Sequence, residues 1–297
     1  MSQAARIESP YSFPPKSTDQ ANTETRAALV NIICMSNGSI RPISGSGVII
    51  DARGVILTNA HVAQYVLLSQ DHAIDLSCTI RTGSPARPMW TASVLYMPPV
   101  WVATHASEIN SAHPVGTGEH DYALLLINGS ATGTSLPVVF PFLPVDMRSA
   151  IGFTGDQVLV AGYPAEFIGG VQAQQNLYAA TSISAIGTLM TFGTGSVDVI
   201  SLGGVIQAQS GSSGGAAVNP WGHLIGLIST TSDGATTADR DLHALTLSYI
   251  DRDLNVQTGS SLSAILGGNL FAEQADFDTR ILPDLMSTYM KQIKPAQ

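Results

Sequence analysis

The sequence is divided throughout into short apolar runs bounded by glycine, proline, asparagine, aspartate or serine. Runs of this length with such boundaries predict β-strands joined by turns. They form two series, the second of which follows a proline-rich stretch at residues 137–144. The first series is ALVNIICM, SGVII, GVILTNA, IDLSCTI, TASVLYM, YALLLI and LPVVFPF, and the second is QVLVAGY, TSISAIGTL, VDVISL, GAAVN, LIGLIST and HALTLSY. We therefore expect two consecutive all-β halves.

The two ends of the chain have a different character. Residues 1–25 contain three prolines and no apolar periodicity, which predicts an extended arm. Beyond residue 261, LSAILGG and FDTRILPDLMSTYMKQI have helical spacing of apolar residues, and Pro283 fits the first turn of the last helix. The expected organisation is an arm at 1–25, a first half at 26–145, a second half at 146–256 and a helical tail at 257–297.

Composition excludes several classes of protein. Charged residues make up 12% of the chain, about half the usual ~25%, and hydrophobic residues make up 44%, so a mostly disordered protein is excluded. The net charge of −9 provides no basic surface for nucleic acid. No run reaches the roughly 18 apolar residues of a membrane span, and the first 26 residues contain no signal-peptide core. A surface solvated mainly by uncharged polar residues favours an extracytoplasmic protein whose export segment is absent from this chain.

The chain has two cysteines, Cys34 and Cys78. They are too few for the disulfide scaffold that small secreted domains use. Both lie in strand-like apolar runs, where a free cysteine behaves as a small hydrophobic residue. One bridge between them and two buried thiols are both consistent with the sequence.

The clearest chemical signal is the segment Gln209–Gly215, QSGSSGG, which places Ser213 directly before two glycines. Glycine lets the backbone turn sharply and lets a substrate carbonyl approach the serine hydroxyl closely. The N–H groups of Gly211 and Ser213 can then point the same way, as the stabilisation of a tetrahedral oxyanion requires. By itself the segment also fits a flexible linker or turn.

Two further segments contain groups that would activate a serine. His61 follows the strand-like run GVILTNA in a nearly neutral segment, where a neutral imidazole can act as a base. Asp121 precedes the apolar run YALLLI, where burial would require a partner such as an imidazole N–H. Each residue alone also fits a structural role, as a surface or core histidine and as an aspartate at a strand entrance.

Together the three segments resemble the chymotrypsin-like serine peptidases, and most closely the bacterial trypsin-like branch that includes the HtrA/Deg proteases. The order His61, Asp121, Ser213 matches that family, as do the phrases SGVII…GVILTNAHV, DYALLLI and GSSGG. The segments LVAGYP and ISAIG are similar to strands of the family's second barrel. The resemblance covers about residues 27–255.

The resemblance implies an all-β fold of two perpendicular six-stranded antiparallel β-barrels, with the site in the cleft between them. Ser213 would attack a peptide carbonyl, His61 would pass its proton to the leaving amine, and Asp121 would hold the imidazole. The N–H groups of Gly211 and Ser213 would bind the oxyanion. These roles imply a serine endopeptidase that acts on proteins or peptides without a cofactor. The alternative is a catalytically silent relative that only binds peptides or proteins.

The chain departs from the family pattern at three places. Ser212 stands where many animal-type members have an aspartate that pairs with a new N-terminus, so we expect no activation of that kind. Val62 stands where those members have a cysteine after the histidine. HtrA proteins continue into a PDZ domain, whereas the residues after 256 have helical spacing here, so we expect a protease domain without that module.

The resemblance also indicates a substrate pocket. Gln207 occupies the position that forms the base of the S1 pocket in trypsin-like members, and because it is not acidic, cleavage after lysine or arginine is disfavoured. Ser229, Thr230 and Thr231 align with the strand that lines S1 and pairs with the substrate backbone. His243 aligns near the opposite wall, where some relatives use a histidine to accept an acidic P1 side chain, and it also fits a histidine that points to solvent beside Asp241. We expect a small or medium uncharged P1 residue.

Residues 97–120 are expected to form a long loop before the aspartate. Its potential metal ligands are His105, Glu108, His113, Glu119 and His120. Their spacing is irregular for a metal site, so we expect a solvated loop and no bound metal.

Overall fold

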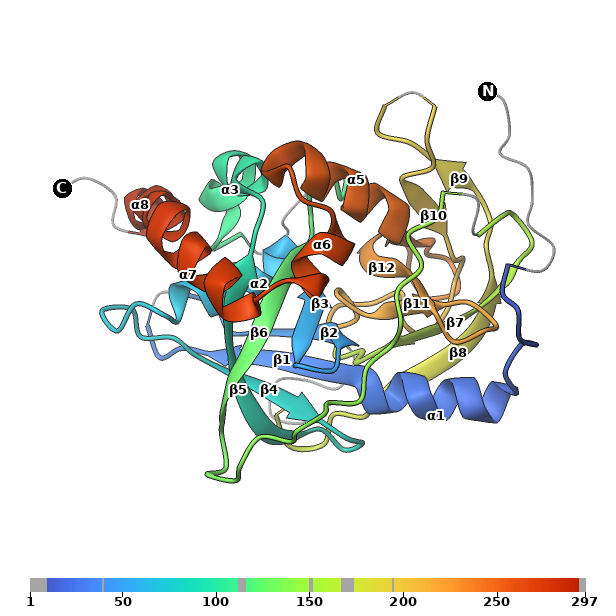
Figure 1. The fold of residues 1–297 in the computed structure, drawn as a ribbon, viewed down its shortest axis with the longest axis horizontal. Helices are drawn as coiled ribbons and strands as arrows, with labels where there is room; N and C mark the ends of the chain where they lie inside the picture. Colours follow the sequence, from blue (N-terminus) through green and yellow to red (C-terminus); the bar gives the residue numbers. More distant parts are fainter. Residues whose placement is uncertain are drawn as a thin grey trace.

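Figure 1 shows a computed structural model of the chain, which describes residues 10–38, 40–111, 116–149, 152–166, 174–193 and 195–293. The first half closes into a six-stranded antiparallel barrel in the order β1-β2-β3-β6-β5-β4. Its strands are β1 (Leu29–Met35), β2 (Ile43–Asp51), β3 (Val55–Thr58), β4 (Ser77–Thr82), β5 (Arg87–Tyr96) and β6 (Ala123–Ser130). The predicted first barrel is therefore confirmed.

The second half forms a seven-stranded antiparallel sheet in the order β8-β7-β11-β12-β13-β10-β9, where six strands were predicted. Its strands are β7 (Gln157–Gly162), β8 (Ala180–Ala185), β9 (Leu189–Met190), β10 (Val199–Ser201), β11 (Ala216–Val218), β12 (Leu224–Thr231) and β13 (Leu242–Thr246). The extra strand arises because the run TSISAIGTL divides in two. Between its parts, Ile186 and Gly187 donate their N–H groups to Asp156 and Ser201, so the pairing with β7 ends.

The connection between the halves contains the run LPVVFPF, for which the prediction of a strand is wrong. Pro137 and Pro141 have no N–H group to donate to a strand ladder. Val138 and Val139 are 98% and 63% exposed, whereas Phe140 is buried. The segment is therefore an irregular connection, which contacts the barrel through the ring of Phe140 against Trp90 and through the bond from the Phe140 N–H to the carbonyl of Ala52.

The extended arm predicted at residues 1–25 is wrong over its last part, because α1 (Thr18–Ala28) is a helix. Ser17 caps the helix by accepting a backbone N–H of the first turn with its hydroxyl. The buried residues of this helix are Ala21, Thr25 and Ala28. Such small side chains produce no apolar periodicity, so the sequence pattern missed the helix. Residues 1–9 lie outside the described residues.

The predicted helical tail is confirmed within the described residues. It consists of α5 (Leu247–Thr258), α6 (Leu262–Gly267), α7 (Leu270–Arg280) and α8 (Leu282–Ile293). The first of these helices begins earlier than expected because the hydroxyl of Thr246, the last residue of β13, caps it. Pro283 lies in the first turn of α8. Helices α7 and α8 lie beside the first barrel, where Tyr289 is fully buried and donates to Gln64 of α2 (Ala60–Leu68) (Figure 1).

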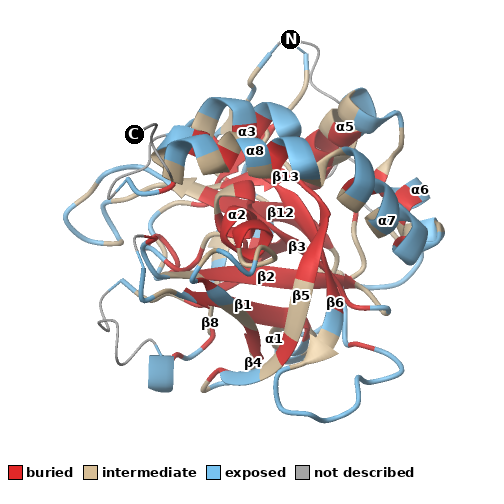
Figure 2. Ribbon diagram, turned by 90° about the vertical axis from the view of Figure 1, so that its left-hand side faces the viewer, coloured by how far each residue is buried: buried red, intermediate tan, exposed pale blue. Residues whose placement is uncertain are grey.

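The buried residues of the strands face the interior of the molecule (Figure 2). One hydrophobic cluster joins the two halves, since it includes Leu57 and Leu126 of the barrel and Leu227 and Leu245 of the second sheet. Densely packed interiors have low compressibility and allow little relative motion of the elements that share them. This shared core therefore holds the two halves, and the polar residues between them, in one relative position.

Cys34 and Cys78 form a disulfide bond. They face each other directly on β1 and β4, which are neighbouring strands of the barrel. Of the two alternatives that the sequence left open, the structure selects the bridge.

Removal of this bridge by Cys34→Ala and Cys78→Ala is expected to lower the free energy of unfolding by about 4 kcal/mol. The two cysteines are separated by 44 residues, so the bond removes much of the entropy of loop closure from the unfolded chain. Urea unfolding measures the loss, and wild-type protein kept under reducing conditions should match the double variant. A difference of less than about 1 kcal/mol would contradict the expectation.

Candidate active site

The first barrel places a histidine at the start of α2. Strand β3 ends at Thr58, Asn59 is the N-cap, and His61 follows in the first turn with its side chain 32% exposed. Its Nδ1 lies 2.8 Å from Oδ2 of Asp121, and its backbone N–H donates to Oδ1 at 2.9 Å. The two residues that the sequence paired are therefore in direct contact.

Asp121 lies just before β6 and is 5% exposed. Besides the two bonds from His61, its carboxylate accepts the hydroxyl of Ser229 at 2.9 Å. Its backbone carbonyl accepts Nδ2 of Asn59 at 2.8 Å. A carboxylate with this many donors is fixed in orientation, and it fixes the imidazole of His61 in turn.

The electrostatics of the pair follow from burial and mutual charge. Burial alone would raise the pKa of Asp121, but the charge of His61 and the hydrogen bonds from His61 and Ser229 lower that pKa below its usual value. Burial would lower the pKa of His61, but the charge and hydrogen bond of Asp121 raise it above its usual 6.5. Asp121 is therefore an anion at neutral pH and keeps a proton on Nδ1 of His61, which leaves Nε2 of the neutral ring as an acceptor.

Ser213 lies on the turn that leads into β11. Its hydroxyl donates to the carbonyl oxygen of Ser229 at 3.3 Å, and in the described part of the chain it makes no hydrogen bond to His61. Ser229 thus contacts two of the predicted site residues, because its hydroxyl donates to Asp121 and its carbonyl accepts from Ser213. The three residues predicted from separate segments are brought to one place, with Ser213 turned toward Ser229.

The turn around Ser213 requires glycine at two positions. Gly211 and Gly214 have φ of 95° and 86°, a region that favours glycine. A Cβ atom at Gly211 would lie 2.6 Å from the carbonyl oxygen of Tyr163, and one at Gly214 would lie 2.0 Å from that of Ser46. Within the described residues, the N–H groups of Gly211 and Ser213 have no acceptor. The two donors predicted to bind an oxyanion are therefore available to a ligand.

Ser46 of β2 holds this turn against the first barrel, a role that was not predicted from the sequence. It is fully buried; its N–H donates to the carbonyl of Ser213 at 2.7 Å, and its hydroxyl donates to the carbonyl of Gly211 at 2.7 Å. The same hydroxyl accepts the N–H of Tyr163 at 2.9 Å. The only sequence signal was a small polar residue at the start of SGVII, because its partners lie far away in the chain.

Gln207, predicted at the base of the substrate pocket, is fully buried. Its Nε2 donates to the carbonyl of Val160 at 3.2 Å, while its Oε1 has no hydrogen-bond partner among the described residues. A buried amide with an unpaired acceptor is a neutral group that can receive one hydrogen bond.

The other predicted substrate-binding residues lie on β12 and β13. Ser229 donates to Asp121, whereas Thr230 is half-buried and Thr231 is exposed. Nδ1 of His243 lies 3.4 Å from the hydroxyl of Thr230, and its Nε2 lies 3.3 Å from Oδ2 of Asp241. The histidine is thus held between two polar neighbours instead of facing solvent alone.

A second histidine–aspartate pair lies next to Asp121. His120 has φ of 59°, which is uncommon for a residue with a Cβ atom. Its N–H donates to the hydroxyl of Tyr249 at 3.0 Å, and its Nδ1 lies 2.9 Å from Asp253. Tyr249 and Asp253 belong to α5, so this helix holds the backbone beside Asp121. His120 was expected in a loop, and its partners could not be predicted because they lie more than a hundred residues further along the chain.

The long loop predicted at residues 97–120 is wrong over its first part. There α3 (Pro99–His105) and the 3₁₀ helix η1 (Ala106–Glu108) form, because Trp101 and Val102 are buried in the barrel core. His113 lies outside the described residues. Among the residues described, no three His, Cys, Asp or Glu side chains are grouped so that they could hold a metal ion.

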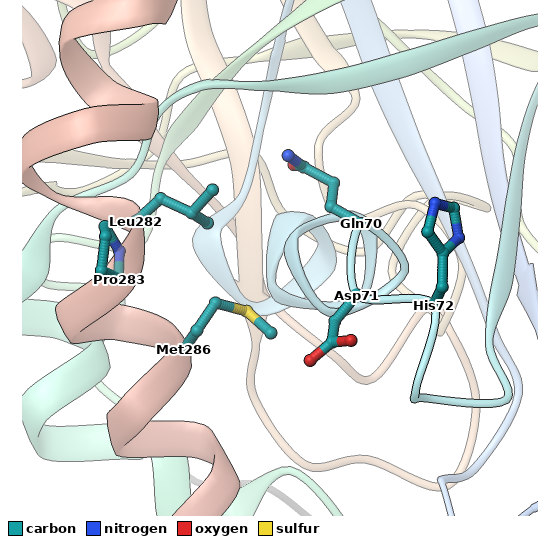
Figure 3. Close-up of a pocket in the computed structure, with 6 residues that line it drawn as sticks. All are labelled: Gln70, Asp71, His72, Leu282, Pro283 and Met286. Carbon is teal, nitrogen blue, oxygen red and sulfur yellow. The ribbon is translucent and has the colours of Figure 1, made fainter.

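A separate pocket lies between the end of α2 and helix α8 (Figure 3). It is lined by Gln70, Asp71, His72, Leu282, Pro283 and Met286. None of the predicted site residues lines this pocket, and we assign it no function.

A closed barrel that carries a histidine and an aspartate, joined to a second sheet that carries a serine between glycines, defines the class of trypsin-like peptidases. The family described as trypsin-like peptidase domain matches residues 45–227, and the chain belongs to this family. Among solved structures, the chain is similar to the serine endoprotease from Yersinia pestis, at 21% identity and a TM-score of 0.50, with 83% of this chain and 69% of that chain covered. At this identity the likeness concerns the fold.

No curated protein matches the chain. In the described ranges, no helix has both the length and the apolar character needed to cross a membrane.

Proposed function

We propose that the protein is a serine endopeptidase that hydrolyses peptide bonds through Ser213, His61 and Asp121. The observation that carries this proposal is the 2.8 Å contact between Nδ1 of His61 and Oδ2 of Asp121, with Ser213 linked to the same carboxylate through Ser229. This contact orients a neutral imidazole so that its Nε2 can take a proton from a serine hydroxyl.

In the proposed reaction, the hydroxyl of Ser213 first rotates from the carbonyl of Ser229 toward Nε2 of His61. His61 takes the proton while Oγ bonds to the substrate carbonyl carbon, and Asp121 stabilises the imidazolium. The N–H groups of Gly211 and Ser213 bind the oxyanion. His61 then protonates the leaving amine as the C–N bond breaks, and an acyl-enzyme remains. Water, deprotonated by His61, releases the acid and restores the hydroxyl.

We propose that the P1 side chain is small or medium and uncharged. A cationic side chain could donate a hydrogen bond to Oε1 of Gln207 but would find no opposite charge in that neutral amide, which is costly for a buried charge. An acidic side chain that approached His243 would meet the carboxylate of Asp241, which lies 3.3 Å from its Nε2. Thr230 and Thr231, at the end of β12, would pair with the substrate backbone as an added strand.

We also propose that the protein works outside the cytoplasm. The support is the Cys34–Cys78 disulfide, because such bonds form and persist mainly in oxidising compartments. Protein and peptide substrates fit this proposal, whereas a net charge of −9 disfavours nucleic acid as a partner.

A fluorophosphonate probe, which labels activated serines, tests the assignment. We expect labelling of the wild type, none of Ser213→Ala, and full labelling of Ser210→Ala and Ser212→Ala. Ser210 is an exposed control, and Ser212 is a buried one whose hydroxyl has no hydrogen-bond partner among the described residues. Loss of labelling in Ser210→Ala together with labelling of Ser213→Ala would show that the nucleophile is wrongly assigned.

The alternative function is a peptide-binding relative without turnover. The observation in its favour is that Ser213 donates to the carbonyl of Ser229 instead of to His61. This alternative requires that the wild type neither reacts with the probe nor cleaves an unfolded protein. A peptide-library cleavage profile of the wild type against Ser213→Ala would distinguish the two functions and measure the P1 preference.

A further inference from the structure

Two loops that meet near the serine turn are joined by an ion pair. Nη1 of Arg240 lies 2.7 Å from Oε2 of Glu166, and its Nη2 lies 3.0 Å from Oε1. Glu166 follows β7 and Arg240 precedes β13, and their side chains are 31% and 14% exposed. A planar guanidinium that meets a carboxylate at two points sets the orientation of both groups. The pair therefore fixes these two loops relative to each other.

Both members of the pair also hold the main chain just before the serine turn. Oε2 of Glu166 accepts the N–H of Ser210 at 3.2 Å, and Nη1 of Arg240 donates to the carbonyl of Ala208 at 2.9 Å. The residue before Glu166 adds a third bond, because the N–H of Ala165 donates to the carbonyl of Ser210 at 2.8 Å. The pair thus binds the carbonyl of Ala208 and the N–H of Ser210, and the backbone of Ala165, next to Glu166, binds the carbonyl of Ser210.

These bonds determine where the N–H of Gly211 points. The carbonyl of Ser210 and the N–H of Gly211 belong to one planar trans peptide group, so they point in opposite directions. The bond from Ala165 holds the carbonyl, and rotation of this peptide would turn the N–H away from a bound oxyanion. The orientation of the first predicted oxyanion donor therefore depends on contacts made by residues 165 and 166.

Ser212 does not provide a charged anchor for this turn. Its hydroxyl is buried and has no hydrogen-bond partner among the described residues. The aspartate of animal-type members pairs there with a chain terminus, and a neutral serine cannot form that ion pair. The charged anchor of the turn is the Glu166–Arg240 pair, and the hydrogen bond from Arg240 keeps the pKa of Glu166 below its usual value.

We infer that Glu166 and Arg240 are positioning residues that keep the N–H of Gly211 directed at the oxyanion by fixing the Ser210–Gly211 peptide. This inference rests on the proposed peptidase activity. Because an oxyanion is present only after the serine attacks, loss of the pair acts on kcat and leaves KM nearly unchanged. Because the pair is partly exposed, salt weakens it.

Kinetics of Arg240→Gln and Glu166→Gln test the inference. Each substitution is expected to lower kcat about tenfold with KM changed less than about twofold, and the double variant is expected to be no slower than the slower single variant. Raising NaCl to about 1 M should lower the wild-type kcat toward the variant value and leave the variants unchanged. The control is Arg280→Gln, which removes an exposed pair with Asp276 on α7 and should behave as wild type.

The inference is wrong if the wild type is active and both single variants have the same kcat as the wild type. It is also wrong if Arg280→Gln lowers kcat as much as Arg240→Gln and Glu166→Gln do. A second measurement does not depend on turnover: hydrogen exchange of the Ser210 amide in a Ser213→Ala background. Exchange should accelerate in Arg240→Gln, and unchanged exchange would refute the inference even if the peptidase proposal holds. If exchange accelerates but the wild type neither reacts with the probe nor cleaves a peptide, the peptidase proposal is wrong, whereas the role of the pair in holding the turn is supported.

Discussion

Changing Asp121 to asparagine is expected to lower kcat for peptide hydrolysis about 10⁴-fold while the protein stays folded. The carboxylate accepts the backbone N–H and Nδ1–H of His61 and the hydroxyl of Ser229. An asparagine amide has an NH₂ group in place of one acceptor oxygen. If this group faced Nδ1, the ring proton would move to Nε2, and His61 could no longer take a proton from Ser213.

The same substitution is expected to change the pH dependence. In the wild type, the charge and hydrogen bond of Asp121 outweigh burial and raise the pKa of His61 above 6.5. His61 must be neutral to act as the base, so kcat/KM is full above that pKa and falls as the pH drops through it. Without the Asp121 charge, burial lowers the pKa of His61, and the fall should occur at lower pH.

Initial rates on one peptide substrate between about pH 5 and 9 measure both effects. Asp276→Asn, on an exposed face of α7, is the control, and thermal unfolding checks that both variants are folded. A folded Asp121→Asn variant with kcat within about tenfold of the wild type would show that Asp121 does not orient a catalytic histidine.

Gly211→Ala is expected to lower kcat by about 10²- to 10³-fold, the usual effect of removing one oxyanion donor. Gly211 has φ of 95°, and an added Cβ would lie 2.6 Å from the carbonyl oxygen of Tyr163 and 2.8 Å from Cβ of Ala165. These are backbone and near-backbone atoms that cannot rotate aside as the end of a long side chain can. The turn itself must therefore rotate, and the N–H of residue 211 rotates with it.

Gly155→Ala is the control for Gly211→Ala, because it introduces backbone strain at a positive φ without a steric clash. Gly155 has φ of 89°, and nothing lies within 4 Å of the position that its Cβ would occupy. This variant should lose some stability but keep the wild-type rate of acylation, measured under single-turnover conditions. Equal rates of acylation in the two variants would contradict a role for the Gly211 N–H.

The candidate site residues could be proposed from the sequence because each signal is local. His61 follows a strand, Asp121 precedes one, and Ser213 stands between glycines, and each feature occupies fewer than ten residues of sequence. The residues that hold them were not recognisable. Ser46 is a small polar residue at the start of a strand, and nothing nearby indicates that it binds the backbone of residues 211 and 213.

The errors in the fold have a different origin. The run LPVVFPF has the composition of a strand, but prolines remove the N–H groups that a ladder needs. Helix α1 buries alanine and threonine, which a search for large apolar residues does not detect. In both cases the hydrophobicity of the run did not indicate the element that forms.

The two β-rich halves, the helical tail and the order of the three candidate site residues can be predicted from the sequence, because strand periods, turn residues and glycine requirements act over a few neighbouring positions. The bridge between Cys34 and Cys78, the link that Ser229 makes within the predicted triad, and the bonds of Glu166 and Arg240 to the serine turn are visible only in the folded molecule. Each of these contacts joins distant residues, and hydrogen bonds are short and directional. Whether such partners meet is set by how the strands pair and how the two halves pack, which local sequence does not specify.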